Sequence, residues 1–102
     1  MGQCLGGEAA WWTERLDEVV TAVKEAEMAH WADEGDAKVA AIEAALETSH
    51  QSWLSYREAE CAYVKAQNEG TNFGPASGAT CELQVTSDRV LSLLRRLDFL
   101  SR

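Results

Sequence analysis

Proline and basic residues are both scarce in this sequence. One proline and nine Lys or Arg residues occur among 102 residues, against 17 Asp or Glu, so the formal net charge is −8. Nucleic-acid binding is not expected, since neutralising phosphates requires clusters of Lys and Arg. The acidic balance fits either a solvated surface that keeps the protein in solution or attraction to a basic partner.

The residue patterns of most active sites are missing. No two cysteines are spaced as C-x-x-C, so no metal site is predicted. His50 lies about three helical turns before Cys61, too far for a thiol–imidazole pair. The glycine-rich segment 70–78 lacks the Lys-Ser/Thr ending of a phosphate-binding loop. We therefore expect no catalytic residue, no cofactor and no enzyme activity.

No stretch is apolar and long enough to form a transmembrane helix. The N-terminal Met1-Gly2-Gln3-Cys4 has neither the basic nor the apolar region of an export signal. The chain is therefore expected to be either cytosolic or trimmed at its start. Three cysteines would give three free thiols in the cytosol, or one pair and one orphan in an oxidising compartment.

Apolar residues at three- and four-residue steps predict three helices, at about residues 5–30, 36–68 and 80–99. Gly35 suits the end of the first helix, and Asp36 suits the N-cap of the second. The small and flexible residues of 69–79 predict a connecting loop. The sequence thus predicts one all-α domain over 1–102, a three-helix antiparallel bundle.

Antiparallel packing brings Cys4, Cys61 and Cys81 toward one end of such a bundle. A bridge between Cys61 and Cys81 would close a loop of about 20 residues, a stabilisation of ~3 kcal/mol. An orphan Cys4 would then link two copies in vitro into a reducible dimer. A redox role for three clustered thiols is the alternative.

Trp53, Arg57 and Cys61 share one face of the second predicted helix. The Arg57 guanidinium is expected to stack on Trp53 and to pair with a carboxylate of the third helix, Asp88 or Glu82. The expected arrangement is a packed seam with a satisfied ion pair.

Four tryptophans are many for this length. Trp11 and Trp31 fall on or near solvated faces, so they are candidate anchors for a protein partner. Covering the edge of the core is the equally weighted alternative. Phe73 lies near the middle of the predicted loop and is a third candidate anchor.

Two elements occur in order, W-x-x-Y-R-x-x-x-C and C-x-x-x-x-T-x-x-R, which place Trp53, Tyr56, Arg57, Cys61, Cys81, Thr86 and Arg89. With Gln3-Cys4-Leu5 and the Trp11–Leu16 stretch, they resemble the LprI-type lysozyme-inhibitor family of small helical bacterial proteins, secreted or lipid-anchored. The family usually carries an export signal and a further upstream cysteine, which this sequence lacks.

The resemblance implies a disulfide between Cys61 and Cys81 that joins the second and third helices. It also implies a structural seam formed by Trp53, Tyr56, Arg57, Thr86 and Arg89. The function expected from it is non-enzymatic protein binding in the periplasm or outside the cell, in its sharpest form inhibition of a lysozyme. The net charge of −8 favours a cationic lysozyme as the partner. The candidate inhibitory loop is Gly70–Gly78, because a protruding loop beside a disulfide can enter a cleft. The alternative is a scaffolding module of the cell envelope with no enzyme target.

Overall fold

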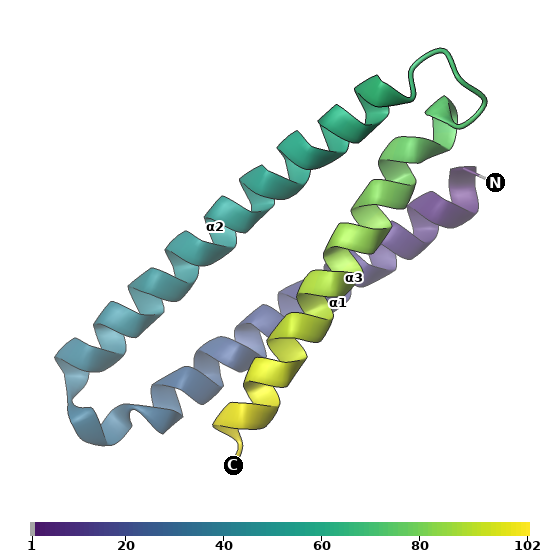
Figure 1. Cartoon of the computed structure of the whole chain (residues 1–102). Helices are drawn as coiled ribbons and strands as arrows, with labels where there is room; N and C mark the ends of the chain where they lie inside the picture. The colour runs from purple at the N-terminus through teal and green to yellow at the C-terminus, as the bar shows by residue number, and fades with distance from the viewer. Residues whose placement is uncertain (1) are drawn as a thin grey trace.

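The computed structural model describes residues 2–102, and side chains from residue 7 onward. Its long helices are α1 (Gly2–His30), α2 (Asp36–Gln67) and α3 (Gly74–Leu100), with a short 3-10 helix, η1, at Ala32–Glu34. Helices α1 and α3 run in one direction and α2 returns in the other (Figure 1). The predicted all-α, three-helix architecture is confirmed.

The core lies mainly between α1 and α3. Its buried members are Leu16, Val23, Val90, Leu93 and Leu100. From α2, Leu46 and Trp53 pack against this cluster and remain partly exposed. In α2, whose side chains are all described, Cys61 is the one buried residue. Helix α2 therefore has less apolar contact to hold it in place than the other two helices.

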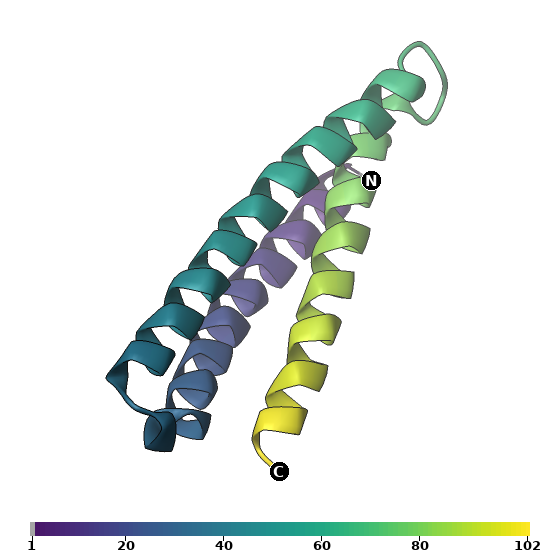
Figure 2. The same cartoon turned by 60° about the vertical axis from the view of Figure 1, so that its left-hand side comes forward.

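The molecule is elongated, with principal extents of 56 × 21 × 16 Å. Helices α2 and α3 lie close together at their connecting loop and farther apart at the opposite end, as both views show (Figures 1 and 2).

The turn between α1 and α2 differs in one detail from the prediction. Gly35 has a positive φ of 99°, and it is the N-cap of α2. Asp36 is thus the first residue of the helix, and no side-chain hydrogen bond caps it. Its carboxylate still lies in the first turn, where the helix dipole favours negative charge.

The predicted loop 69–79 is wrong in its second half, because α3 already begins at Gly74. Pro75 lies in the first turn of α3, where a missing N–H removes no helical hydrogen bond. Gly74 is required by close approach, since a Cβ there would lie 2.7 Å from the Asn68 carbonyl oxygen. Proline and glycine, taken as marks of a loop, here start a helix.

Among the described residues, no helix combines the length and the apolarity that crossing a membrane requires.

Candidate functional site

A disulfide joins Cys61 of α2 to Cys81 of α3, with their Cα atoms 5.5 Å apart. Both cysteines are buried, and the bond crosses the seam between α2 and α3. The predicted pairing is confirmed. The side chain of Cys4 lies outside the described residues, so the Cys4-linked dimer stays a prediction.

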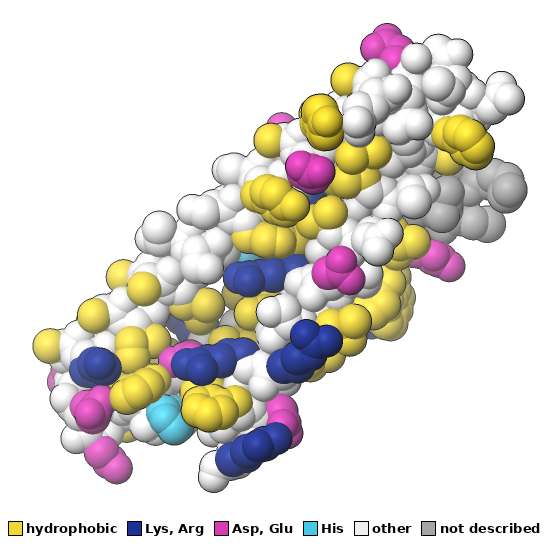
Figure 3. Space-filling model, viewed as in Figure 1, with side chains coloured by type: hydrophobic (Ala, Val, Ile, Leu, Met, Phe, Trp, Pro, Cys, Tyr) yellow, Lys and Arg dark blue, Asp and Glu magenta, His cyan; other side chains and the backbone are white. Residues whose placement is uncertain are grey.

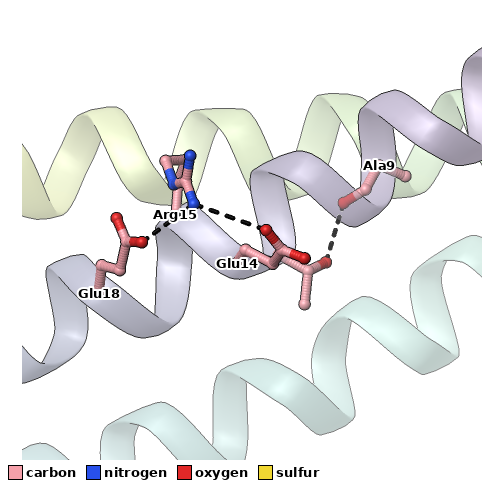
Figure 4. A network of polar contacts seen from close by, with 5 residues as sticks. Ala9, Glu14, Arg15 and Glu18 are labelled. Atoms are coloured by element: carbon pink, nitrogen blue, oxygen red, sulfur yellow. Dashed lines mark hydrogen bonds and ion pairs between the residues drawn. The ribbon is translucent and has the colours of Figure 1, made fainter.

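Arg57 connects all three helices through hydroxyl groups. Its Nη1 donates to Thr86 Oγ1 of α3 at 3.1 Å and to Thr13 Oγ1 of α1 at 3.4 Å. Thr86 is completely buried. Thr13 Oγ1 donates in turn to the Ala9 carbonyl oxygen at 3.0 Å (Figure 4). This arrangement fixes the rotation of α2 relative to α1 and α3.

The expected carboxylate partner of Arg57 is not found. Among the described side chains, Arg57 forms no ion pair, and both Asp88 and Glu82 are exposed. Two threonine hydroxyls take the position that a carboxylate was predicted to occupy. The structure therefore corrects the predicted ion pair and retains the predicted stacking, because Arg57 Cζ lies 5.1 Å from the Trp53 ring centre.

Guanidinium groups from two helices lie near the ring of Trp53. Arg89 of α3 places its Cζ 5.9 Å from the ring centre, and burial lowers the pKa of this arginine. The His50 ring is parallel to the indole within 8°, with 6.4 Å between the ring centres. Tyr56 is 54% exposed and lies outside this group.

Phe73 is the most exposed large apolar side chain among those described, at 73%. It lies immediately before α3 and lines an apolar pocket of about 440 Å³ with Val64, Ala76, Cys81 and Val85. The disulfide therefore borders this pocket and holds its two walls, α2 and α3, at a fixed separation.

The other two candidate anchors have different environments. Trp11 is 49% exposed and packs edge-on against Trp12. Trp31 is half-buried and donates its Nε1–H to Glu27 Oε2 at 2.9 Å, while Lys38 lies 5.0 Å from its ring centre. Each indole thus has a cation over its ring, since Arg15 Cζ lies 5.0 Å from the ring centre of Trp11, but Trp31 is less exposed and its N–H is bonded within the protein.

A polar cluster at the end of the bundle away from the disulfide was not among the predicted sites. The buried carboxylate of Glu27 accepts from Arg96 Nε at 3.1 Å in addition to Trp31 Nε1. The four-residue spacing of Glu27 and Trp31 is the one local signal from which the Glu27–Trp31 contact could have been predicted. The partner on α3 carried no local signal, because residues 27 and 96 are far apart along the chain.

The outer face of α1 is acidic. Its Arg15 lies between Glu14 and Glu18, with Nη2 at 3.6 and 2.9 Å from their carboxylates (Figure 4). Lys24 pairs with Glu43 of α2 at 3.0 Å, and this hydrogen bond and charge raise the pKa of Lys24. Both cations are therefore balanced by nearby acids.

No three His, Cys, Asp or Glu side chains in the described part of the chain are arranged to hold a metal ion.

A family model described as "Lysozyme inhibitor LprI" matches residues 1–93, a span that includes the disulfide and the Trp53 seam. The chain belongs to the LprI family of lysozyme inhibitors. Comparison with curated proteins and with solved structures gave no match. Membership of the LprI family implies a non-enzymatic role with lysozyme as the partner class, and the disulfide is consistent with an extracytoplasmic location.

Proposed function

We propose that this protein is a periplasmic or secreted inhibitor that binds a lysozyme directly. The family match over residues 1–93 carries the proposal. The Cys61–Cys81 disulfide supports the compartment, since such bonds persist where thiols are not kept reduced.

The charge distribution supports a cationic partner. Residues 1–69, which contain α1 and α2, hold 14 of the 17 acidic residues and five of the nine basic ones. Lysozymes are commonly cationic, so this acidic part of the surface would speed their approach and orient them. Binding should therefore weaken as salt screens the charges.

Phe73 and the pocket beside it are our candidate contact surface. An exposed aromatic ring next to an apolar pocket provides the buried anchor that interfaces depend on. The nearby disulfide keeps this surface preorganised, which lowers the entropy lost on binding. Trp11 is the second candidate anchor. Trp31 is the weakest of the three, because its indole N–H is already bonded to Glu27.

A lysozyme lysis assay tests the proposal. The disulfide-bonded protein should lower the lysis rate at low salt and do so less at physiological salt. Phe73→Ala should weaken inhibition about 30-fold, the equivalent of about 2 kcal/mol at an interface anchor. Phe99→Ala is the matched control, because Phe99 is also exposed and lies at the other end of α3.

Unchanged lysis at a large molar excess of the protein would end the inhibitor proposal for the lysozyme tested. The scaffolding alternative predicts this outcome together with capture of a different envelope protein in a native pull-down. If Phe73→Ala and Phe99→Ala changed the inhibition of lysis equally, the inhibitor proposal would stand and Phe73 would be rejected as the anchor.

A further inference from the structure

Three nitrogen-bearing side chains surround the indole of Trp53 in the seam between α2 and α3. The Cζ atoms of Arg57 and Arg89 lie 5.1 and 5.9 Å from the ring centre. The centre of the His50 imidazole lies 6.4 Å from it. Two permanent positive charges and one titratable ring thus share a small, partly buried region, where like charges repel.

The protein supplies no counter-charge to this group. The ion pairs among the described side chains use other cations, namely Arg15, Lys24, Arg96 and Arg102. The side chains of residues 1–6 are not described, but none of these residues is Asp or Glu. A partly buried guanidinium without a counter-ion is unfavourable. The chain has 17 acidic residues, yet none of those described forms an ion pair with Arg57 or Arg89.

Two buried nitrogen atoms of the group also lack hydrogen-bond partners. Arg89 Nε and His50 Nδ1 are buried and have no hydrogen-bond partner among the described atoms. Burial lowers the pKa of Arg89, and no ion pair among the described side chains involves this arginine. Arg57 uses Nη1 for its two threonine partners, and no hydrogen bond among the described side chains engages its Nη2.

A hollow on the molecular surface lies farther along the bundle from this group. A cavity of about 390 Å³ is lined by Leu46 of α2 and by Glu27 and Arg96, among others. His50 lies one helical turn beyond Leu46, and Arg89 lies two turns before Arg96. Figure 3 shows Lys and Arg side chains over α3 along the recess between α2 and α3. Glu27 already neutralises Arg96, so the unpaired charge is at the Arg89 end.

We propose that Arg89, Arg57 and His50 bind a carboxylate group whose apolar stem lies beside Trp53. A guanidinium presents a planar fork of donors that matches a carboxylate, and the indole and the neighbouring Leu46 provide apolar surface. The carboxylate comes either from a small carboxylic acid or from an Asp or Glu side chain of a protein partner. The site requires no lysozyme and goes beyond the proposed function.

An NMR titration of the ¹⁵N-labelled, disulfide-bonded full chain tests the site. Sodium propionate should shift the Arg89 Nε–H and Trp53 Nε1–H signals with saturation at roughly millimolar concentration. Sodium chloride at equal ionic strength should not. The blocked peptide acetyl-Gly-Glu-Gly-amide presents only a side-chain carboxylate. Tighter binding of propionate supports a free acid as ligand, and tighter binding of the peptide supports a protein side chain.

Matched variants locate the site. Arg89→Gln should weaken propionate binding at least tenfold. Arg95→Gln removes the same charge from an exposed position of the same helix and should leave binding unchanged. Arg89→Lys keeps the positive charge and is expected to fold. It lacks the planar fork of donors, so it should bind propionate at least threefold more weakly than the wild type. The proposal is overturned if chloride reproduces the propionate shifts, or if Arg95→Gln weakens binding as much as Arg89→Gln.

Discussion

Reducing the Cys61–Cys81 bond should strongly destabilise this protein. The two residues are 20 positions apart, and closing a loop of that length in the unfolded chain corresponds to about 3 kcal/mol. Small domains are stable by only about 5–15 kcal/mol. At about 4–8 °C per kcal/mol for a chain of this size, the melting temperature should fall by about 12–24 °C.

The structure also predicts which part loosens first. Helices α1 and α3 share the buried core, whereas α2 is held by Leu46, Trp53, Arg57 and the disulfide. Without the covalent bond, the end of α2 near Cys61 should open while the contact between α1 and α3 persists. Amide hydrogen exchange should therefore increase most in the C-terminal half of α2.

The experiment compares thermal unfolding of the oxidised and the dithiothreitol-reduced protein by circular dichroism, in a Cys4→Ser background. Reduction is preferable to substitution, because it leaves both buried sulfur atoms in place. The control is the Cys61→Ala/Cys81→Ala variant, whose melting temperature should not respond to dithiothreitol. A difference below about 2 °C between the two forms would refute the loop-entropy argument.

Two further substitutions test the polar contacts between helices. Thr86→Val keeps the shape of a fully buried side chain and removes the acceptor of Arg57, so urea unfolding should show a loss of about 1–3 kcal/mol. The exposed Thr21→Val control should change stability by less than about 0.5 kcal/mol, and a Thr86→Val protein as stable as wild type would contradict the role of this contact. Glu27→Gln should cost about 1–2 kcal/mol, since it removes a charge-assisted hydrogen bond to a half-exposed Arg96 and leaves an acceptor for Trp31. Asp98→Asn, which affects the exposed pair with Arg102, is its control, and equal losses for the two variants would show that burial of Glu27 adds nothing.

The sequence predicted the break between α1 and α2 better than it predicted the start of α3. The break before α2 followed from Gly35, whose positive φ suits a residue without a Cβ. Gly35 does not itself end α1, which stops at His30 and is followed by η1. The start of α3 did not follow, because proline and glycine occur both in loops and in the first turn of helices. The contact of Gly74 with Asn68 distinguishes the two cases, and it exists only in the folded chain.

Some contacts of the candidate site could likewise be predicted from the sequence, and others could not. The stacking of Arg57 on Trp53 followed from their four-residue spacing on one helix. The partners of Arg57 did not, because choosing Thr13 and Thr86 over Asp88 or Glu82 depends on how three helices are rotated about their axes.

Apolar periodicity alone was enough to specify an all-α bundle, because a repeat of 3.6 residues is a local property of the chain. The disulfide pairing was implied by the family motifs, which the LprI match supports. Packing of the three helices against one another decided the rest: the burial of Glu27 beside Arg96, the uncompensated charge around Trp53 and the pocket next to Phe73. These features join residues from different helices, and their contacts arise only once the core has set the register and rotation of each helix.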